Sequence, residues 1–402
     1  MNKEPLANDE MVVGNCGLRK GYKQTEVGVI PEDWDVSCVG NSFDVCNQLR
    51  LPISQAIRER MTGTYPYYGP TGIQGWINEY RIEGRYALIG EDGDHFLKWR
   101  TQSMTLMVQG KFNVNNHAHL VQGSKNLTDW FYWFFSNRDI TNHLTRQGAG
   151  RYKLSKSTLI NLPCSLPPLS EQCAIATALS DVDALLAKLD QLITKKRDLK
   201  QAAMQQLLTG QTRLPGFSGE WEVKQLFEVA NCLDNLRVPL NEAQRNQMRG
   251  DFPYCGANGV LDYVNDYVID DDIILVAEDG GYFDEYAYRP IAYRMVGKCW
   301  VNNHAHILKA KADYDQDFIF YSLVHKNILN FLASGTRAKL NKSEMWKIEV
   351  NIPFNSLEQT AIATILSDMD AEITALEARR DKTRDLKQGM MQELLTGRIR
   401  LV

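Results

Sequence analysis

Several features that mark other classes of protein are missing from this chain of 402 residues. No apolar run approaches the ~20 residues that a helix needs to span a membrane. The N-terminus carries Glu4, Asp9 and Glu10 in place of the apolar core of a secretory signal. The eight cysteines form no Cys-x-x-Cys pair, so a structural zinc site is disfavoured and we expect reduced thiols in a cytoplasmic protein.

A basic surplus is missing as well. The net charge is −4, which by itself slightly disfavours nucleic acid as a partner. Hydrophobic residues make up 44% of the chain and charged residues 23%, which is ordinary for a globular protein. The length leaves room for two domains and a spacer.

What the chain does contain is an internal repeat. Residues 171–214 return as residues 358–401, at an offset of 187, and 26 of the 44 aligned positions are identical by direct count. Neither copy contains proline, and Gly389 is the one glycine before the Leu-Leu-Thr-Gly end of either copy. A long helix-forming segment that occurs twice indicates a repeated architecture.

Each copy predicts a long helix with a narrow apolar stripe. Apolar residues recur at alternating intervals of four and three, the pattern of a helix that packs against one partner helix. They are Ile175, Leu179, Val182, Leu186, Leu189 and Ile193 in the first copy, and Ile362, Leu366, Met369, Ile373 and Leu376 in the second. Ser170 and Glu171 suit a helix start, and Gly210 and Gly397 suit helix ends.

The two helices predict the arrangement of the whole chain. Some 40 residues at ~1.5 Å each form a rod of about 60 Å. The second helix can bury its stripe along the first only by running back. We therefore predict an α+β fold in which a long antiparallel two-helix coiled coil separates two similar domains with approximate two-fold symmetry. The expected boundaries are a leader at 1–22, domains at 23–169 and 213–356, and helices at 170–212 and 357–402.

The two globular segments repeat each other too. Trp34 and Trp221 differ by the same 187 residues. Short runs broken by Gly, Asn and Pro predict strands joined by turns; they recur as 65–80 with 252–267, 88–94 with 275–281, and 113–120 with 300–307. A helix is expected from Thr128 to about Arg146, with its aromatic run at 130–135 buried, and another from Tyr314 to about Ala333. A basic loop containing glycine follows each helix.

A family resemblance rests on the paired helices that run from PLSEQ or SLEQ to LLTG, on the IPEDW segment and on the two matched domains. In these features the chain resembles the specificity (S) subunit of type I restriction–modification systems. The resemblance covers nearly the whole chain from Lys23. It implies a non-catalytic subunit with two target-recognition domains, each of which reads one half of a split target in double-stranded DNA. The helices would then set the distance between the half-sites, as in dimeric DNA-binding proteins.

The same resemblance implies the partners. Two methyltransferase (M) subunits are expected to dock on the chain, joined by restriction (R) subunits, with no membrane involved. S-adenosylmethionine, ATP and Mg²⁺ are then expected in the partner subunits, and no cofactor in this chain. Partner subunits would also supply phosphate neutralisation that an acidic chain lacks.

Residues that are identical in both domains cannot by themselves distinguish two different half-sites. The Asn-Asn-His-x-His motif at 115–119 recurs at 302–306, and the Glu-Asp-Gly turn at 91–93 recurs at 278–280. We interpret both mainly as hydrogen-bonding groups of turns and strands, with shared DNA contacts as the alternative. A metal held by the paired histidines and the acidic turn is disfavoured.

Base reading should use side chains that differ between the domains. Arginine suits guanine edges and Gln or Asn suits adenine, whereas small residues and backbone amides in the glycine-containing loops suit phosphates. The DNA-binding candidates of the first domain are Gln74, Trp76, Lys98, Arg100, Arg146, Gln147, Gly148, Arg151 and Lys153, with His95 and Trp99 beside them. Those of the second are Asn258, Tyr286, Arg289, Ser334, Gly335, Thr336, Arg337 and Lys339, with Tyr282 and Tyr288 beside them. We expect no catalytic and no metal-binding residue.

The basic residues of the long helices are expected to be solvated or to face partner proteins. They are Lys195, Lys196, Arg197, Lys200, Arg379, Arg380, Lys382, Arg384 and Lys387.

Two other functions stay open at this point. The first is an adenine methyltransferase or nuclease, because Asn-Ile-Pro-Phe at 351–354 is similar to the Asn-Pro-Pro-Phe methylation motif. Against it, isoleucine replaces a proline, and no glycine-rich loop for S-adenosylmethionine follows a predicted strand. A strand end that leads into the helix explains this run and Asn-Leu-Pro-Cys at 161–164. The second is a coiled-coil scaffold that spaces protein partners without binding DNA.

Overall fold

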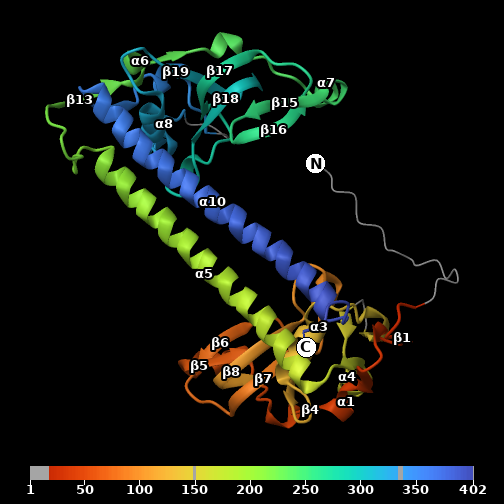
Figure 1. Ribbon diagram of the computed structural model, residues 1–402. Coiled ribbons are helices and arrows are strands. Elements are labelled where there is room, and N and C mark those ends of the chain that lie inside the picture. The colour runs from red at the N-terminus through yellow and green to blue at the C-terminus, as the bar shows by residue number, and fades with distance from the viewer. Residues whose placement is uncertain (1–17, 148–150, 334–337, 402) are drawn as a thin grey trace. The chain divides into compact units, whose positions relative to one another are not determined.

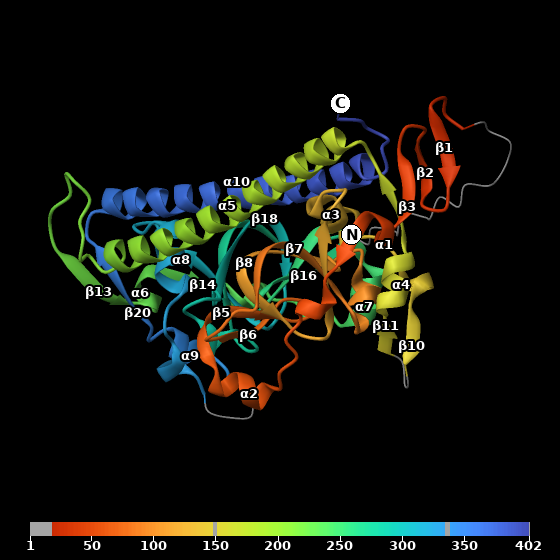
Figure 2. The same cartoon turned by 90° about the horizontal axis from the view of Figure 1, so that it is seen from below.

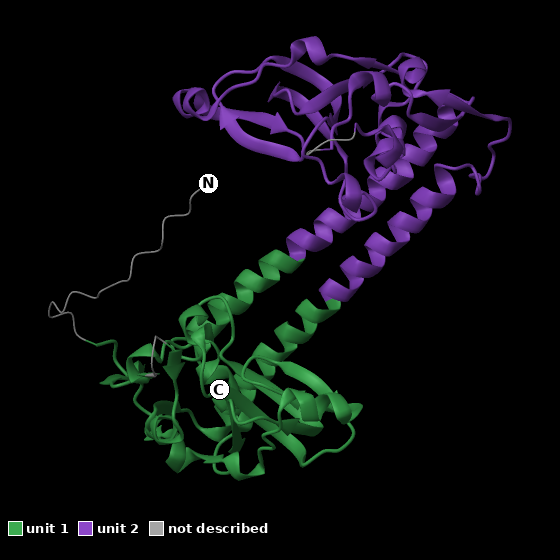
Figure 3. Ribbon diagram, turned by 180° about the vertical axis from the view of Figure 1, so that it is seen from behind, with its two compact units in different colours: residues 1–188, 380–402 green, residues 189–379 purple. Residues whose placement is uncertain are grey.

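The computed structural model describes residues 18–147, 151–333 and 338–401, which form two compact units (Figure 3). Unit 1 comprises residues 1–188 and 380–402, and unit 2 comprises residues 189–379. The long helices α5 (Leu169–Leu207) and α10 (Ser356–Leu394) each contribute one part to unit 1 and the other part to unit 2. Among the described residues, no helix has the length and apolar character needed to cross a membrane.

Unit 1 is built around a six-stranded sheet with the order β4-β9-β7-β8-β5-β6 (Figure 1). The strands are β4 (Phe43–Val45), β5 (Thr62–Tyr68), β6 (Ile73–Ile77), β7 (Ile82–Gly90), β8 (Thr105–Val114) and β9 (Ala118–Gly123). Neighbours are antiparallel except β5 and β8, which pair in parallel. Both faces of β7 are covered, because Ala87 and Ile89 belong to one apolar cluster and Leu88 to another.

Unit 2 repeats this sheet in the order β14-β19-β17-β18-β15-β16. The strands are β14 (Ala230–Cys232), β15 (Arg249–Gly256), β16 (Gly259–Val264), β17 (Ile269–Ala277), β18 (Ala292–Val301) and β19 (Ala305–Ala310). Here β15 and β18 form the parallel pair. The predicted duplication of a mixed α+β domain is confirmed at the level of strand order and direction.

One buried helix packs on each sheet. Helix α3 (Thr128–Ser136) covers β7, β8 and β9, and α8 (Gln316–Val324) covers β17, β18 and β19. The prediction that the aromatic run of α3 is buried is confirmed, although Tyr132 keeps partial exposure.

Both helices are shorter than the sequence predicted. The chain leaves the helix at Asn137 and His325, whose side chains bind another segment of their own unit. Asn137 Nδ2 donates to the Trp99 carbonyl at 2.7 Å, and His325 Nδ1 donates to the Tyr286 carbonyl at 2.8 Å. The one-turn helices η3 (Thr141–His143) and η6 (Leu329–Phe331) follow in place of the expected continuation.

Two-stranded ribbons complete the units. In unit 1, β3 (Asp35–Cys38) pairs with β12 (Pro163–Leu166), β10 (Thr145–Gln147) pairs with β11 (Arg151–Lys153), and β1 (Tyr22–Thr25) pairs with β2 (Gly28–Pro31) beside β3 (Figure 2). In unit 2, β13 (Trp221–Gln225) pairs with β20 (Glu349–Pro353). Because Asn351 pairs with Val223 in this ribbon, the strand explanation of the Asn-Ile-Pro-Phe run is confirmed.

The remaining helices are short. They are α1 (Val39–Ser42), α2 (Gln55–Arg60), α4 (Lys156–Asn161), α6 (Leu226–Val229), α7 (Glu242–Gln247), α9 (Lys342–Met345), η1 (Asn47–Leu49), η2 (Asp94–Lys98), η4 (Asp234–Leu236) and η5 (Phe283–Glu285).

Within each unit the long helices pack against each other in antiparallel fashion. In unit 1, Ile175 and Leu179 share an apolar cluster with Leu394. In unit 2, Met204 and Leu207 share one with Ile362 and Leu366. Rising residue numbers on α5 meet falling numbers on α10 in both units, so the antiparallel prediction is confirmed.

Ion pairs flank this apolar seam. Asp183 binds Lys387 at 2.5 Å in unit 1, and Lys196 binds Glu372 at 2.7 Å in unit 2. Lys200 also binds Asp370, and Arg197 binds Glu377. The expectation that these cations are solvated or partner-facing is corrected for Lys196, Lys200 and Lys387, which are half-buried, whereas Arg197 stays exposed as expected. They lie beside the seam, where opposite charges on two packed helices meet.

The ends of the long helices are as predicted, but the first start is not. Gly210 and Gly397 have φ values of 71° and 69°, the left-handed conformation that ends a helix. Ser170 lies inside α5 and does not cap it. Glu171 lies in the first turn as predicted, but it is buried: it is 1% exposed, accepts a hydrogen bond from Trp34 Nε1 at 2.9 Å and is paired with Arg400 at 2.6 Å.

Candidate nucleic-acid interface

The acidic turn after β7 is fastened to the β10–β11 ribbon in unit 1. Glu91 is bound by Arg50 at 2.7 Å and lies 3.7 Å from Lys153 Nζ. The Leu154 amide donates to the Glu91 carbonyl at 2.7 Å, and the Gly93 amide donates to the Tyr152 carbonyl at 3.1 Å. The turn, the η2 helix that follows it and the ribbon therefore form one continuous surface.

Unit 2 builds the same surface from its own residues. Glu278 is bound by Arg237 and by Lys339, the latter at 2.9 Å. The Leu340 amide donates to the Glu278 carbonyl at 2.7 Å, and Asp279 forms a β-bridge with Lys339. Burial on its own raises the pKa of Glu278, but hydrogen bonds from Lys339 and Arg237 outweigh burial and hold this pKa below its ordinary value.

The Asn-Asn-His-x-His motif joins this surface through hydrogen bonds. Asn115 Oδ1 accepts from the His117 amide at 2.8 Å, and His117 Nδ1 lies 2.8 Å from Asp92 Oδ2. The equivalent distances in unit 2, from Asn302 to His304 and from His304 to Asp279, are also 2.8 Å. The motif therefore takes part in turn and strand hydrogen bonding as interpreted, and shared DNA contacts by its exposed residues stay an alternative.

The second histidine of each motif is buried and differs in charge. Both His119 and His306 donate from Nε2 to a backbone carbonyl, Leu154 at 2.7 Å and Leu340 at 2.8 Å. In unit 1, burial lowers the pKa of His119, and its Nδ1 accepts from Asn47 Nδ2 at 2.8 Å.

In unit 2, a carboxylate replaces that amide. His306 Nδ1 donates to Asp234 Oδ2 at 2.7 Å. Burial alone lowers the pKa of His306, but the Asp234 carboxylate outweighs burial and raises it to about 9. Burial likewise raises the pKa of Asp234, and the hydrogen bond from His306 brings it down to about 2. A neutral imidazole in unit 1 thus corresponds to a buried ion pair in unit 2.

Within residues 18–147, 151–333 and 338–401, Cys232, Asp234 and His306 form a group that could hold a metal, because one ligand atom of each lies within 4.8 Å of the others. The geometry favours an ion pair instead. Both ring nitrogens of His306 already donate, and the Arg237 guanidinium lies 3.2 Å from Asp234. A cation in contact with the carboxylate opposes a second cation at the same place.

Most basic candidates of unit 1 come together on the surface formed by the turn, η2 and the ribbon. Lys98 ends η2, Arg100 lies two residues later with its guanidinium 4.9 Å from the Trp99 ring, and Arg151 begins β11. Arg146 on β10 donates to the Tyr152 hydroxyl at 2.7 Å and remains exposed. Lys153 is part of the Glu91 cluster, so a phosphate would compete with that carboxylate for it.

The described candidates of unit 2 lie in or next to the matching turn. Arg289 pairs with Glu285 at 3.3 Å and its guanidinium lies over the Tyr282 ring. Asn258 donates from Nδ2 to the Gly280 carbonyl at 2.8 Å, which leaves its Oδ1 to accept. Tyr286 packs partly against the core of the unit.

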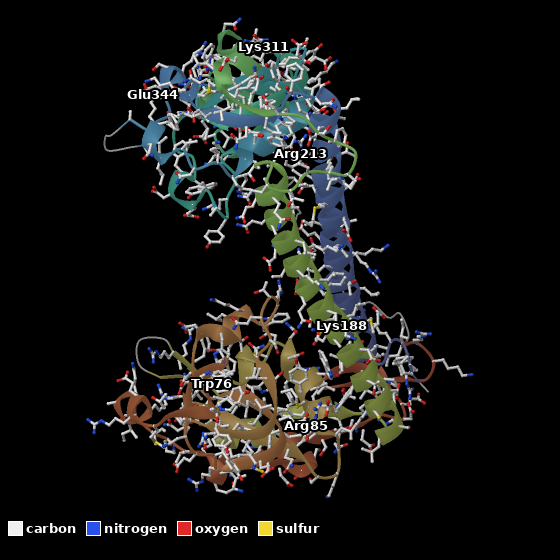
Figure 4. All side chains as sticks on the ribbon, turned by 90° about the vertical axis from the view of Figure 1, so that its left-hand side faces the viewer. Trp76, Arg85, Lys188, Arg213, Lys311 and Glu344 are labelled. Carbon is white, nitrogen blue, oxygen red and sulfur yellow. The ribbon has the colours of Figure 1, made fainter. Side chains whose placement is uncertain are left out.

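Gln74 and Trp76 lie on β6, the outermost strand of the unit 1 sheet. Gln74 Oε1 accepts from Asn115 Nδ2 at 2.9 Å, so this strand is connected to the acidic turn through the repeated motif. Trp76 is 52% exposed and its side chain lies at the surface of the unit (Figure 4).

The sequence reasoning missed the partner of Trp76. Tyr263, at the same offset of 187, lies on the outermost strand of unit 2 and is 54% exposed. A lysine also lies over a tyrosine ring at the same place in each unit, Lys111 over Tyr80 at 4.6 Å and Lys298 over Tyr267 at 4.5 Å. The repeat offset, applied position by position, was the signal that could have found these residues.

Some candidates are outside the described part of the chain. These are Gly148, Ser334, Gly335, Thr336 and Arg337. For Gln147 the structure gives the backbone, which pairs with Arg151 in the β10–β11 ribbon.

The two units share one design and carry different side chains on matching surfaces. The comparisons with known proteins give the class of protein. The family model described as the type I restriction modification DNA specificity domain matches twice, at residues 31–196 and 218–383. The chain therefore belongs to the type I restriction–modification DNA specificity family, and its role is that of a DNA-recognition subunit.

Relatives agree with this assignment. The chain is 24% identical over 422 residues to the MjaVIII specificity subunit of Methanocaldococcus jannaschii, a match that covers 95% of this chain and 96% of the relative. It is 38% identical over 159 residues, or 39% of each chain, to a putative specificity subunit of Haemophilus influenzae. The crystal structure of an S subunit from M. genitalium has the same fold, with a TM-score of 0.66 at 16% identity over 90% of this chain and 96% of that one.

Proposed function

We propose that the chain reads a bipartite DNA target through two target-recognition domains, residues 23–169 and 213–356, with one half-site for each. One observation supports this most directly. The same acidic turn and outer strand occur in both units, and a lysine segment bridges to the turn in each (Lys153 to Asp92, Lys339 to Asp279), while the exposed side chains differ. A shared frame with different surface chemistry suits two different half-sites.

Within this proposal the exposed residues have separate roles. Arg100, Arg146, Arg151 and Lys98 in unit 1, with Arg289 and Asn258 in unit 2, contact base edges or phosphates. Trp76 and Tyr263 offer apolar surface to the nucleic acid on the outermost strand of each sheet. Residues outside the described part of the chain, Gly148 and 334–337, keep their proposed role as phosphate contacts, together with Gln147, Lys153, Tyr286 and Lys339.

The long helices determine the distance between the half-sites and dock two methyltransferase subunits, to which restriction subunits are added. Bond chemistry then belongs to those partners, together with S-adenosylmethionine, ATP and Mg²⁺, while this chain contributes recognition in the cytoplasm. The ion pairs at the seam hold the two helices together and leave their outer faces for partners.

The assignment of one half-site to each unit is tested by exchanging a domain. Residues 35–160 are replaced by the corresponding segment of another specificity subunit, and methylated adenines are mapped by single-molecule sequencing in cells that also contain the methyltransferase. One half-site is expected to change while the other stays the same. A change in both halves contradicts the proposal.

The role of the helices is tested by lengthening them together. One heptad is inserted after Lys188 and a matching heptad before Arg380, so that the antiparallel seam is preserved. Seven residues add ~10 Å, or about three base pairs, to the preferred gap between unchanged half-sites. A fixed gap would show that the helices do not set the spacing.

A catalytic role is tested directly. The isolated chain is incubated with DNA and tritiated S-adenosylmethionine, and no methyl transfer is expected without the methyltransferase subunit. Transfer by the isolated chain would support the enzyme alternative.

A further inference from the structure

Unit 2 contains a hollow with both polar and apolar lining, and one of its lining residues, Tyr286, is also a recognition candidate. Its volume is about 420 Å³, and it lies where the C-terminal part of α5 meets the end of α8. Gln201 and Gln205 line it from α5, and Ser322 and Lys326 line it from α8 and the residues that follow. The long helix α5 forms one wall of this hollow, whereas it takes no part in the candidate nucleic-acid interface.

Lys326 is the distinctive residue of this hollow. It is half-buried, and among the described residues its ammonium group forms no hydrogen bond or ion pair. Burial lowers the pKa of Lys326, against an opposing electrostatic influence from Glu349. His325 beside it uses Nδ1 to bind the Tyr286 carbonyl, which leaves Nε2 as its other polar atom at the hollow. A half-buried cation without a partner favours an incoming anion.

Unit 1 shows what fills the equivalent place. Arg138 stands two residues after α3, as Lys326 stands two residues after α8. Its guanidinium lies 4.2 Å from the Phe134 ring and donates to the Val27 carbonyl at 2.7 Å. Val27 belongs to the turn between β1 and β2 and packs against the core of unit 1. The cation of unit 1 therefore receives both an oxygen and an apolar neighbour from its own chain.

The residues of unit 2 do not supply such a cover. Ser322 stands where unit 1 has Phe134, and the described segment before Trp221 forms no ribbon like β1–β2. Arg213 in that segment binds Glu358 instead. Among the described residues of unit 2, none places an oxygen on the Lys326 ammonium group, which leaves this position open to an oxygen from a partner.

We propose that this hollow binds an acidic side chain of the methyltransferase subunit, with its carboxylate on Lys326 and a small apolar neighbour over Ser322. The proposal rests on the proposed docking of methyltransferase subunits along the long helices, and it adds an asymmetry to that docking. The partner on unit 2 inserts a segment into the hollow, whereas unit 1 fills the equivalent place with Val27. A protein carboxylate fits better than a nucleic-acid phosphate because α5 forms one wall.

The test measures binding of the purified methyltransferase subunit to the full-length chain by titration calorimetry. Lys326→Glu reverses the charge, and Ser322→Phe fills the hollow with the residue of unit 1. Each is expected to weaken binding by about tenfold or more. Lys125→Glu, an exposed lysine in unit 1 with the same change of charge, is the control and should bind like the natural chain. Circular dichroism confirms that each variant is folded.

The outcomes separate the two proposals. Equal binding by all variants would overturn the hollow as a docking site while leaving the recognition function intact. A natural chain that does not bind the methyltransferase subunit at all would overturn both. A Lys326→Glu variant that binds the subunit normally but loses DNA in the assembled complex would assign the hollow to a phosphate and reject the protein carboxylate.

A zero-length carbodiimide crosslink identifies the occupant. It joins a lysine amine to a carboxylate in contact with it, so peptide mapping of the treated complex should find Lys326 linked to an Asp or Glu of the methyltransferase subunit. The control linkage, between Lys387 and Asp183 on the long helices, should appear with or without the partner. Mapping that finds the control linkage and no linkage from Lys326 to the partner contradicts the proposal.

Discussion

Units 1 and 2 share a fold, yet they balance their buried charges differently. Each long helix has a buried glutamate near its start. In unit 1 this residue, Glu171, accepts hydrogen bonds from two kinds of donor, the guanidinium of Arg400 and Trp34 Nε1. In unit 2 the equivalent Glu358 binds Arg213, and among the described residues Trp221 Nε1 has no hydrogen-bond partner. The buried histidine is neutral beside Asn47 in unit 1 and charged beside Asp234 in unit 2.

The difference teaches that duplication has preserved geometry more strictly than electrostatics. Strand order, the acidic turn and the Gly ends of the helices are the same in both units. Each unit has an equivalent buried histidine, beside an amide in unit 1 and beside a carboxylate in unit 2. This single difference is enough to change the charge of the histidine. Buried charges tolerate such changes only when a partner changes with them.

The largest expected effect comes from removing the arginine that holds each acid. Arg213→Met leaves Glu358, which is 0% exposed, without a donor, and we expect unit 2 to lose about 3–5 kcal/mol of unfolding free energy. Arg400→Met should cost unit 1 less, about 2–3 kcal/mol, because Trp34 Nε1 still donates to Glu171. Urea unfolding followed by hydrogen exchange of peptides from each unit measures the two losses.

A second substitution checks the cause. If the unpaired carboxylate is responsible, Arg213→Met combined with Glu358→Gln should recover part of the stability lost by Arg213→Met alone. Equal losses in the two units, or no recovery in the double variant, would contradict this account.

The next effect is a dependence on pH that has opposite sign in the two units. The pKa of His306 is raised to about 9 in the folded chain, whereas in the unfolded chain it is about 6.5. The ion pair of His306 therefore contributes fully to the stability of unit 2 below pH 6.5, and this contribution is lost as pH rises through about 9. A shift from 6.5 to about 9 corresponds to at most about 3–4 kcal/mol. His119 has a lowered pKa, so unit 1 loses stability when pH falls below about 6.5 and loses none from this group above it.

Hydrogen exchange of two matched amides measures this dependence after correction for the intrinsic rate. The Leu340 amide, which binds the Glu278 carbonyl, should lose protection from pH 6.5 to about 9, and the Leu154 amide, which binds the Glu91 carbonyl, should not. Arg237 and Cys232 also border the His306 pair, so the Asp234→Asn variant serves as the reference without the carboxylate. The same trend at both amides would reject the assignment to His306.

A smaller effect follows from converting unit 2 to the arrangement of unit 1. Asp234→Asn keeps the oxygen that accepts from the Ile307 amide at 2.9 Å and removes the negative charge. His306 can then become neutral, as His119 is, so we expect a loss of about 1–2 kcal/mol and disappearance of the alkaline pH dependence. Asp234→Leu, which offers neither polar atom, should cost more. Urea unfolding at pH 6.5 and 9 compares the three chains.

How much of this was visible in the sequence can be judged from particular residues. The duplication, the antiparallel helices and the Gly210 and Gly397 ends follow from spacing alone, because heptads and a repeat offset are properties of the chain. The lengths of α3 and α8 do not. They depend on whether Asn137 and His325 find a distant carbonyl, which is a tertiary contact that local sequence does not encode.

The candidate interface shows the same limit. The repeated offset indicated which loops to compare, and the structure brings η2 and the β10–β11 ribbon together as one surface. Sequence could not show that Lys153 and Lys339 belong to clusters around Glu91 and Glu278, because those contacts join segments far apart in the chain. It also did not show that Trp76 and Tyr263 stay exposed, since an aromatic residue on a strand is more often buried.

The smallest expected effect on stability is the most specific test of the comparison. Asn47→Asp in unit 1 keeps the oxygen that accepts from the Leu120 amide and turns the other atom from donor to acceptor. Since His119 Nε2 must still donate to Leu154, the ring can bind the introduced carboxylate only by taking up a proton, so its pKa should rise above 6.5. Stability should change by less than about 1 kcal/mol, because the cost of burying the charged ring offsets the new ion pair. Histidine NMR titration measures the pKa, with His306 as the internal reference, and a ring that stays neutral at pH 6 would show that the neighbouring amide or carboxylate does not set its charge.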